Sequence, residues 1–488
     1  MSIQEQVKIV NTDVVVAGGG PAGLGAAIAA ARNGAKVILI EKAENLGGMF
    51  TGGLVMGFHG MRVHRNRHTV NVYQYNNWYE EQVIWGITQE IMDKLIDLGG
   101  AWGEKGRSTS CVLTDPEIVK YVVEEMCNEA GVDVWYQSLV TRPVIEQGKI
   151  SGVLVENKSG QHLINAKVVI DATGDADVAA RSGVPFEQGG PNGEVQPVTL
   201  TFVMAGVELD KTIAYMKENP EELHSGDIAV WDKLYHEKQP INLNGFYKLI
   251  SQAFENGDYP MALGAKNPIP IFVISSVFRW GQIAEDQTFQ IVDMAYNIDT
   301  TKGKDVSAAL LNTRKQAMLL AQFMRKYIPG YENAYLLQTA SQLGIRESRR
   351  IIGQYQLNQS DVEDGRDFED TIARCGRAMN VHSSDGGKIG EKQGGRKWIE
   401  IKDAKTYGIP YRCLLPKEGP DNLLVVGRAI SVDRIALGSV RGQPACMATG
   451  EAAGAAAALA VKNDSSVHNI DITQLQETLL RQGVKIKR

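Results

Sequence analysis

The sequence predicts an α/β fold in which a parallel-sheet domain is interrupted by an inserted α+β domain. Two observations predict this class. Before about residue 190 and after about residue 330, buried apolar runs end in glycines and lead into helical runs, as in βαβ units. Between them, strand-like alternation and one long helical run replace that pattern. We therefore expect residues 1–190 and 331–470 to form the parallel-sheet domain, 191–330 the inserted domain and 471–488 a C-terminal tail.

The first apolar unit spans residues 13–42 and reads DVVVAGGGPAGLGAAIAAARNGAKVILIEK. Its β-branched run predicts a buried strand over 12–17, its alanine-rich run a helix over 21–33, and its last run a second strand over 36–41. Strand, glycine-rich turn, helix and strand follow one another as in a Rossmann-type unit. The turn therefore predicts a bound dinucleotide, although glycines also serve tight packing alone.

Each glycine of the GxGxxG turn has a predicted role. Gly18 allows the tight turn, Gly20 lets a pyrophosphate approach the main chain, and Gly23 brings the helix against the strand. The helix N-terminus offers free N–H groups and a positive dipole end to that pyrophosphate. Glu41 is expected to accept hydrogen bonds from the adenosine ribose. The predicted contacts at this turn also include Pro21, Ala22 and Lys42.

Three later segments favour FAD as the dinucleotide. The glycine-rich segment LGGMFTGG follows the first unit closely enough to continue along an extended ligand, unless it is a flexible surface loop. The segment KVVIDATGDAD is a strand that ends in a second close backbone approach. Near the C-terminus, a strand and a long alanine-rich helix offer a helix N-terminus to the negative charge of a reduced flavin. The cofactor contacts predicted in these segments are Gly47, Gly48, Met49, Ala172, Thr173, Gly174, Asp175, Gly427, Arg428, Gly442 and Gln443.

The elements between the glycine-rich segments follow from capping and alternation. Asp115 and Pro116 open a helix that closes at Gly131, and a strand is expected over 132–136. Three short alternating runs, TRPVIEQ, KISGVLVEN and QHLINA, predict a three-stranded β-meander.

The inserted domain is predicted to cover the substrate. Residues 196–207, 269–278 and 287–296 alternate like strands of an antiparallel sheet, and 305–327 has the apolar spacing of a long helix. The segment 209–259 is rich in charged residues, asparagine and tryptophan and gives no clear pattern.

These segments resemble the glutathione-reductase-like flavoprotein superfamily, and within it the FAD-dependent oxidoreductase family whose members are often labelled xanthan-lyase-like. The matching segments, in family order, are GGGPAGLGAA, LGGMFTGGL, VIDATGDADVAARSG, GEVQPVTLTFVMAGV, TASQLGIRESRRIIG, YGIPYRCLLPK and NLLVVGRAIS…ALGSVRGQPACMATGEAAG. The resemblance implies an FAD-binding Rossmann-type sheet and FAD-dependent redox catalysis. It also implies that FAD lies along Gly18, Gly20, Gly23, Glu41, Gly48, Asp175, Gly427 and Arg428.

A dedicated NAD(P)H domain is not predicted, because no second strand–GxGxxG–helix unit is present. The other glycine clusters, within 189–193 and 386–390, lie in polar segments without a preceding apolar strand. NAD(P)H or another external electron donor or acceptor can still reach the flavin directly.

The composition and net charge limit the classes of molecule that the protein is expected to bind. A formal net charge of -6 gives no basic stripe, so nucleic acid is not an expected partner. The five cysteines are widely spaced without a CxxC pair, which argues against a disulfide framework, a zinc site or an iron–sulfur cluster. The polar N-terminus and the alanine-rich helix with Glu451 argue against a signal peptide and a membrane span. We expect a cytoplasmic, metal-free protein with a small-molecule substrate, either monomeric or homo-oligomeric.

A basic segment, GFHGMRVHRNRHTV, follows the second glycine-rich loop and contains three of the eight histidines. It is either an anion-recognition or proton-transfer loop beside the flavin, or a solvated loop or subunit contact. His59 is also a candidate for covalent flavin attachment. The basic residues are His59, Arg62, His64, Arg65, Arg67 and His68.

The segment GIRESRR supplies a second candidate group. Arg346 and Arg349 are predicted to share a helix face, on which they can clamp a carboxylate or hold the flavin side of the pocket. The alternative is buried salt bridging with Glu347 or Glu369.

The segment MNVHSSDGG places His382 and Asp385 in a predicted loop, and the family resemblance implies that this loop lies near the active site. His382 is the first candidate for general acid or base, although a lone loop histidine more often only forms hydrogen bonds. Tyr411 and Arg412 are secondary candidates for the same pocket.

The expected function is hydride transfer between bound flavin and a small polar organic substrate, with a histidine or tyrosine moving the proton. The basic residues favour a carboxylate, an enolate-forming carbonyl or a sugar-like molecule. A non-redox lyase or isomerase that contains flavin is one alternative. An electron-transfer subunit that needs a partner protein is another.

Overall fold

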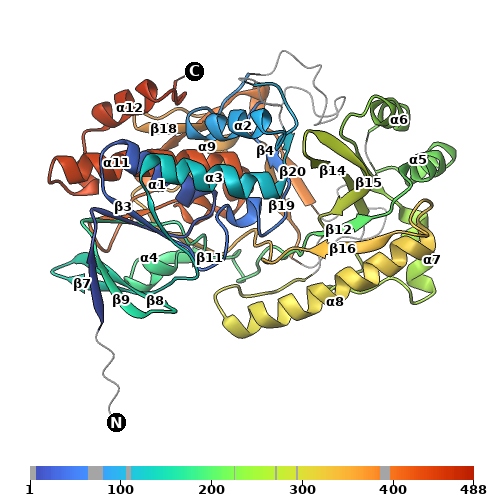
Figure 1. Ribbon diagram of the computed structural model, residues 1–488, viewed down its shortest axis with the longest axis horizontal. Coiled ribbons are helices and arrows are strands. Elements are labelled where there is room, and N and C mark those ends of the chain that lie inside the picture. The colour runs from blue at the N-terminus through green and yellow to red at the C-terminus, as the bar shows by residue number, and fades with distance from the viewer. Residues whose placement is uncertain are drawn as a thin grey trace, which may run out of the picture.

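The computed structural model describes residues 7–63, 81–105, 111–224, 226–269, 272–292, 295–384 and 396–487 (Figure 1). A parallel sheet with its helices occupies the left and centre of the view, and an antiparallel sheet with helices of its own lies at the right. Each region has a large hydrophobic cluster, and Leu54, Met56 and Leu113 of the first region pack into the cluster of the inserted region.

A five-stranded parallel sheet organises the first region. Its strands, in spatial order, are β22 (Leu423–Val425), β10 (Val168–Asp171), β2 (Val14–Ala17), β3 (Val37–Ile40) and β6 (Asp133–Trp135). All residues of the first four are buried, as expected for a sheet that is covered on both faces. The predicted α/β class and the Rossmann-type unit are confirmed.

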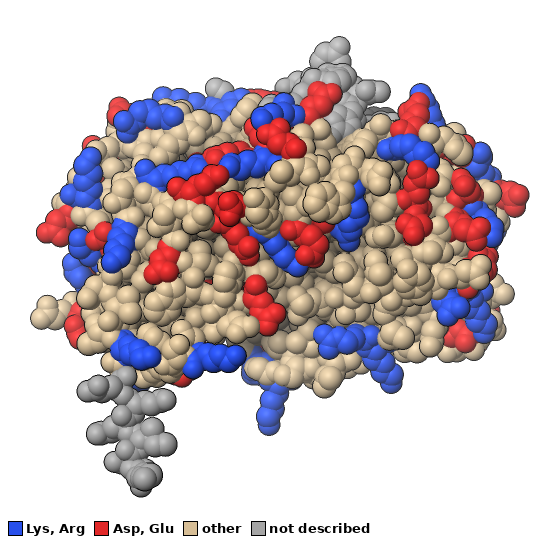
Figure 2. All heavy atoms as spheres, viewed as in Figure 1, with Lys and Arg blue, Asp and Glu red and all other residues tan. Residues whose placement is uncertain are grey.

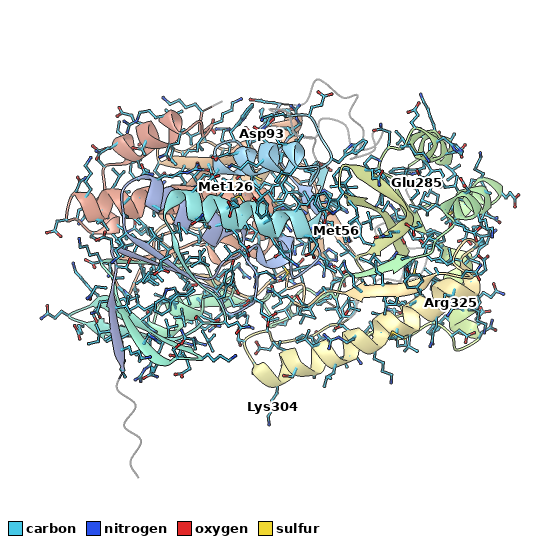
Figure 3. The ribbon with its side chains drawn as sticks, viewed as in Figure 1. Met56, Asp93, Met126, Glu285, Lys304 and Arg325 are labelled. Atoms are coloured by element: carbon cyan, nitrogen blue, oxygen red, sulfur yellow. The ribbon has the colours of Figure 1, made fainter. Side chains whose placement is uncertain are left out.

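The helices of this region begin and end where the capping residues predict. They are α1 (Pro21–Arg32), α3 (Pro116–Ala130) and α11 (Gln443–Lys462). At the start of α3, the Asp115 carboxylate accepts the N–H of Glu117 at 3.1 Å. Gly131 ends the helix in the left-handed conformation, with φ of +77°. Met126 of α3 is fully buried beneath the helix (Figure 3).

A small mixed sheet lies at the lower left of Figure 1 and contains the predicted antiparallel β-meander. The meander strands are β7 (Leu139–Glu146), β8 (Lys149–Asn157) and β9 (Gly160–Asn165), and β1 (Lys8–Asn11) adds a fourth strand parallel to β9. Asn422, just before β22, joins this sheet to the parallel one. Its side chain accepts the N–H of Ile150 and donates to the carbonyls of Ile150 and Lys167, each at 2.9 Å.

The inserted region is an antiparallel sheet with helices, as predicted. Its strands, in spatial order, are β13 (Asn242–Gly245), β14 (Phe272–Arg279), β15 (Gln282–Gln290), β12 (Phe202–Ala205) and β16 (Tyr335–Thr339). Its helices are α5 (Leu209–Glu218), α6 (Ile228–His236), α7 (Tyr247–Glu255) and α8 (Gly303–Tyr327). Lys304 and Arg325 mark the two ends of α8 in Figure 3. β15 begins and ends earlier than the predicted strand 287–296, and β16 lies beyond residue 330.

Short elements connect the two sheets. The paired strands are β4 (Gly57–His59) with β5 (Cys111–Leu113), β11 (Phe186–Gln188) with β17 (Arg349–Ile351), β18 (Thr371–Cys375) with β21 (Tyr407–Pro410), and β19 (Met379–His382) with β20 (Arg396–Ile399). The remaining helices are α2 (Ile87–Asp97), α4 (Asp177–Arg181), α9 (Gln359–Glu363), α10 (Arg434–Val440) and α12 (Ile472–Arg481).

Helices α1 and α11 pack against each other so closely that glycines are needed at the crossing. A Cβ added at Gly450 would overlap the carbonyl oxygen of Ala22, and one added at Gly454 would overlap that of Ala26. Gly25 of α1 faces the main chain of α11 in the same way. Because the contacts advance together along both helices, the helices run in the same direction and both N-termini lie at one edge of the sheet.

We predict that Gly450→Ala lowers the free energy of unfolding by about 1–3 kcal/mol, because the added methyl group overpacks this crossing. Helix propensity alone would favour alanine by about 1 kcal/mol, so the sign of the change is informative. The matched control is Gly303→Ala at the start of α8, where an added Cβ meets nothing within 4 Å. Urea denaturation of both variants checks the prediction, and equal stabilisation by the two substitutions would contradict it.

A buried carboxylate on α11 holds the start of α2. Glu451 is 1% exposed, and its Oε2 accepts the N–H of Ile87 at 3.1 Å. A Cβ at Gly86 would lie 2.5 Å from the same carboxylate, so only glycine allows this approach. Burial raises the pKa of Glu451 to about 8, and the N–H of Ile87 and the charge of Arg32 oppose that rise only in part.

This pKa predicts how stability depends on pH. Because folding raises the pKa of Glu451 from its ordinary value near 4.5, the folded state retains a proton that the unfolded chain loses. The contribution of Glu451 to stability is therefore fully present below about pH 4.5 and is lost as pH rises to about 8. We expect Glu451→Gln to remove this decline, so that its stability relative to the wild type increases from pH 5 to pH 8 and then levels off. Urea unfolding at each pH measures the difference, and a constant offset would contradict the assignment.

Candidate active site

The first glycine-rich turn connects β2 to α1. Gly18 has φ of +106°, and a Cβ there would lie 2.5 Å from the carbonyl oxygen of Ala172. A Cβ at Gly23 would overlap the carbonyl oxygen of Gly18, so the helix lies directly against the turn. At Gly20 an added Cβ meets nothing within 4 Å, which leaves open space in front of the main chain. No side chain caps the N-terminus of α1.

The second glycine-rich loop lies against the first turn. The N–H of Gly47 donates to the carbonyl of Gly19 at 2.8 Å, and a Cβ at Gly48 would lie 3.1 Å from the Cα of Gly20. Met49 follows within a 3-10 turn, and Lys42 is exposed. The structure therefore brings together the two loops that the sequence connects to one ligand.

Glu41 holds this turn in place. Its carboxylate accepts the N–H of Gly19 at 2.6 Å and that of Ala43 at 2.8 Å, and the residue is 6% exposed. Both oxygens thus bind main-chain amides. The contact with an adenosine ribose stays a prediction.

The third turn follows β10 and is organised by Asp171, which was not among the residues predicted from the sequence. One carboxylate oxygen accepts the N–H and hydroxyl of Thr173 at 3.0 and 2.7 Å, and the other accepts the N–H of Ala179 at 2.8 Å. Burial raises the pKa of Asp171, and these donors oppose the rise. The sequence signal that could have identified Asp171 is an acidic residue at the end of an apolar strand.

Two arginines surround this third turn. Arg428 forms an ion pair with Asp175 at 2.8 Å, and a Cβ at Gly174 would lie 2.9 Å from its guanidinium group. The Nε of Arg428 is buried and has no hydrogen-bond partner among the described residues. Arg349 donates to the carbonyl of Asp175 at 2.7 Å and pairs with Asp177 at 2.6 Å.

The segment GIRESRR forms no helix, so the prediction that Arg346 and Arg349 share a helix face is wrong: Arg346 lies in an irregular stretch and Arg349 begins β17. Arg346 donates to the carbonyl of Pro197 at 2.8 Å and to the hydroxyl of Thr199 at 2.5 Å. Its role as a carboxylate clamp stays a prediction.

Glu347 forms buried salt bridges, but with Arg350 and Arg434 and not with Arg346 or Arg349, for which they were the predicted alternative. Its carboxylate is fully buried and pairs with Arg350 and with Arg434, each at 3.2 Å. Glu369 takes part in no such ion pair within the part of the chain that the structure describes.

The N-terminus of α11 lies beside that of α1. A Cβ at Gly427, whose φ is +73°, would lie 3.0 Å from the Cβ of Ala22 and 3.9 Å from that of Cys446. Gly442 precedes the helix without a side-chain cap. Gln443 donates to the carbonyl of Val55 at 3.3 Å, and its buried Oε1 has no hydrogen-bond partner among the described residues.

His59 ends β4 beside this helix terminus. A Cβ at Gly442 would lie 3.3 Å from the carbonyl oxygen of His59, and His59 itself is exposed. The basic residues His64, Arg65, Arg67 and His68 lie outside the described residues. Proton transfer by His59 and covalent attachment of flavin to it both stay predictions.

His382 is the last residue of strand β19 rather than part of a loop, so that local prediction is wrong. It is 5% exposed, and its N–H donates to the side-chain oxygen of Gln196 at 3.0 Å. On the same strand, the carbonyl of Asn380 accepts a hydrogen bond from Arg441 at 2.8 Å, which places β19 next to the start of α11. Asp385 lies outside the described residues.

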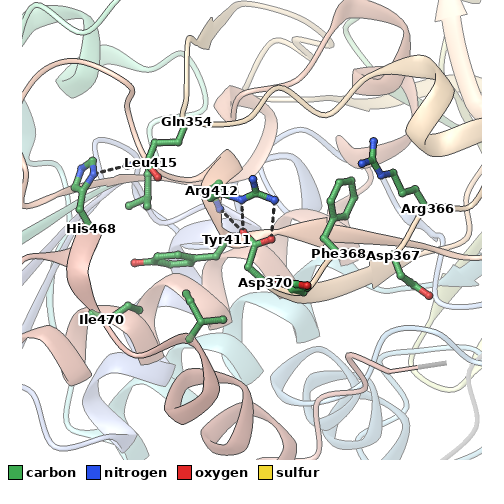
Figure 4. A pocket seen from close by; sticks show the side chains of 12 residues that line it. Gln354, Arg366, Asp367, Phe368, Asp370, Tyr411, Arg412, Leu415, His468 and Ile470 are labelled. Atoms are coloured by element: carbon green, nitrogen blue, oxygen red, sulfur yellow. Dashed lines mark hydrogen bonds and ion pairs between the residues drawn. The ribbon is translucent and has the colours of Figure 1, made fainter.

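Tyr411 and Arg412 lie in a different environment. Tyr411 is 1% exposed and donates to the carbonyl of Val467 at 2.8 Å, while Arg412 pairs with both oxygens of Asp370 at 2.9 and 3.0 Å. Burial raises the pKa of the Tyr411 hydroxyl. The two residues line a cleft of about 420 Å³ together with Phe368 and other residues (Figure 4). These contacts do not support their predicted place beside His382.

Comparison with known proteins identifies the family. Residues 13–479 match the model of the family described as FAD dependent oxidoreductase. The chain belongs to this family. FAD is accordingly its cofactor, and the chain is an enzyme of the oxidoreductase class.

Several proteins are similar to parts of this FAD-dependent oxidoreductase. It is 26% identical over 227 residues to digeranylgeranylglycerophospholipid reductase 1 of Methanococcoides burtonii, a match that covers 45% of this chain and 51% of that protein. It is 32% identical over 178 residues to thiamine thiazole synthase of Methanococcus aeolicus, a match that covers 35% of this chain and 57% of that protein. The chain thus spans a little over half the length of these curated relatives. The solved structure of a geranylgeranyl bacteriochlorophyll reductase-like protein from Thermoplasma acidophilum is 14% identical in sequence. The match covers 98% of this chain and 84% of that chain, with a TM-score of 0.44.

The three turns and the two helix termini fit FAD. The open space before Gly20 and the uncapped N-terminus of α1 would hold the pyrophosphate. The buried Nε of Arg428 is a donor that the protein leaves to a ligand. Gly427 and the start of α11 would lie along the flavin. When bound, FAD supplies two-electron redox chemistry.

Other site types find less support among the described residues. Within them, no group of three or more histidine, cysteine, aspartate or glutamate side chains has a metal-binding arrangement. Among the helices described, α11 meets the length and hydropathy expected of a membrane span, and 94% of that window is buried inside the protein. On the face shown in Figure 2, basic and acidic side chains are interspersed.

We predict that Gly20→Ser lowers FAD affinity at least 10-fold without destabilising the apoprotein. Gly20 has an ordinary φ of -72°, the added side chain enters open space, and serine is a favoured helix N-cap. Gly23→Ala should instead destabilise the apoprotein, because its Cβ overlaps Gly18. FAD fluorescence titration and thermal unfolding of the apoproteins separate these effects. Wild-type FAD affinity in Gly20→Ser would show that the pyrophosphate lies elsewhere.

Proposed function

We propose that this FAD-dependent oxidoreductase transfers a hydride between flavin and a small polar organic substrate, with His382 as the general acid or base. The observation that carries the proposal is the position of His382. It is a buried histidine on β19, beside the start of α11 and in contact with Gln196 at the entry to the inserted region. A histidine at the junction of a cofactor region and a covering region is suited to proton transfer to a substrate held between them.

The residues around β19 favour a substrate on which negative charge resides or develops. Arg441 bonds to the carbonyls of Asn380 and Arg346, and Arg377 bonds to the carbonyl of Gly438 in α10. A Cβ at Gly438 would lie 2.8 Å from the main-chain nitrogen of Asn380, so α10 and β19 are in contact. The nearby guanidinium groups support an organic acid, an enolate-forming carbonyl or a sugar-like molecule.

Each protein group then has a role that its position allows. Gln443 and the N-terminus of α11 orient the ligand and favour negative charge there. Arg346 and Arg441 bind the acidic end of the substrate. His382 accepts or donates the proton, and the inserted region excludes water. We propose that NAD(P)H or another external carrier exchanges electrons at the same place.

The named relatives do not fix the substrate. One is named as a reductase of a large phospholipid and another as a thiazole synthase, so their names describe unlike molecules. The small polar substrate is therefore proposed from the residues at β19 and α11. Non-redox lyase or isomerase chemistry and partner-dependent electron transfer are the alternatives that the experiment must separate.

The test is an anaerobic screen of organic acids, carbonyl compounds and sugars for loss of the oxidised flavin absorbance in the purified holoenzyme. We expect bleaching by a member of these classes, and we expect His382→Gln to slow it about 100-fold or more, since general acid–base catalysis contributes about 10²–10⁴. The same substitution at another buried histidine, His162→Gln in β9, is the matched control. It should leave the rate unchanged.

Three results would count against the proposal. Turnover without any change in flavin absorbance favours a lyase or isomerase. Flavin that is reduced by a partner protein but by no small molecule favours an electron-transfer subunit. Bleaching at the wild-type rate in His382→Gln removes His382 from the mechanism.

A further inference from the structure

Gln196 is a buried amide that connects three segments far apart in the sequence. It is 1% exposed, and its main-chain N–H donates to the carboxylate of Glu347 at 3.2 Å. Its Oε1 accepts the N–H of His382 at 3.0 Å. Its Nε2 is buried and has no hydrogen-bond partner among the described residues.

Within the described residues, strand β19 pairs with one other strand, and the contact of His382 with Gln196 lies on the opposite edge. Strand β19 pairs with β20 along one edge, in a register that sets His382 opposite Arg396. On the other edge, the N–H of His382 bonds to Gln196 and the carbonyl of Asn380 bonds to Arg441. Residues two apart on a strand direct their main-chain groups to the same edge. Two side chains therefore bond main-chain groups on the outer edge of β19, the edge against which Gly438 of α10 also lies.

Gln196 is itself held on a rigid base. The carboxylate of Glu347 accepts the main-chain N–H of Gln196 and forms ion pairs with Arg350 and Arg434. Arg350 is 2% exposed and also donates to the carbonyls of Val432 and Gly189, at 3.0 and 3.1 Å. This cluster fixes the glycine-containing segment 189–196 against the parallel-sheet region. The side-chain amide of Gln196 therefore has a defined position.

The amide group of Gln196 indicates that its side-chain oxygen is needed as a hydrogen-bond acceptor. A residue that only filled space would be apolar, because a buried amide with an unsatisfied N–H group costs about 1–3 kcal/mol. The hydrogen bond to His382 accounts for an amide at this site, since an apolar side chain of the same size cannot accept it.

We propose that Gln196 is a positioning residue for His382. It acts through the main-chain N–H of His382 and fixes the end of β19 from which the imidazole projects. The inference rests on the proposed role of His382 in catalysis, but the contact itself can be tested without that role.

The first test is amide hydrogen exchange of the holoenzyme, measured on peptides that cover residues 379–384. In Gln196→Met, which has a similar volume but cannot accept the N–H, we expect the His382 amide to exchange at least 10-fold faster. The matched control is Gln316→Met, which removes another buried amide, on α8, and should leave these peptides unchanged. If Gln196→Met does not fold, Gln196→Asn takes its place, because its amide is one methylene too short to reach. Unchanged protection of His382 in the folded variant would overturn the proposal.

The second test is the reduction potential of bound flavin at pH 7, measured by dye equilibration in a double-mutant cycle. We expect Gln196→Met and His382→Gln each to shift the potential, and the double variant to shift it no further than His382→Gln alone. Additive shifts would show that Gln196 acts on the flavin directly, which overturns the proposal. If His382→Gln leaves the potential unchanged, the proposed place of His382 beside the flavin fails, and the exchange experiment alone decides the role of Gln196.

Discussion

The close approach of α1 and α11 is the constraint on which the rest of the structure depends. Gly25, Gly450 and Gly454 let the two main chains meet, and the helices run in the same direction. Their positive dipole ends therefore lie together, with Gly427 between them. Parallel dipoles repel each other, so this arrangement is favoured when an anionic ligand lies across both ends. The packing of two helices thus creates an electrostatic requirement that the diphosphate of FAD would satisfy.

Buried carboxylates, more than glycines, determine where the turns lie relative to one another. Glu41 at the end of β3 binds the N–H of Gly19, Asp171 at the end of β10 binds its own following turn, and Glu347 binds the N–H of Gln196. Each uses main-chain N–H groups to offset the cost of burying a charge. The glycines remove steric obstacles, whereas the carboxylates specify which main-chain segments come together.

Much of this arrangement was predictable from the sequence because it is local. The GxGxxG turn, the capping of α3 by Asp115 and Gly131, and the buried strands depend on residues that are adjacent in the chain. The errors arose where long-range contacts decide. GIRESRR has helical spacing, but its last two residues begin strand β17 against β11. His382 joins a strand because β20, some 15 residues further on, pairs with it. Asp171 was missed because a single acidic residue after an apolar run does not reveal which main-chain N–H groups it will meet.

The glycine-rich turns and His382 are held by different sets of contacts. Glu41, Asp171 and the α1–α11 crossing hold the glycine-rich turns within the parallel-sheet region. The main-chain N–H groups of Ser341 and Gln342, just after β16, also donate to the carbonyl of Gly52 in the second loop. The position of His382 instead depends on Gln196, at the entry to the inserted region, and on the strand β20. Changes at Gln196 or in β20 are therefore expected to move His382 while the contacts of Glu41 and Asp171 persist. The glycine-rich turns carry a local sequence pattern that predicts the cofactor, whereas the contacts of His382 join segments that are far apart in the chain.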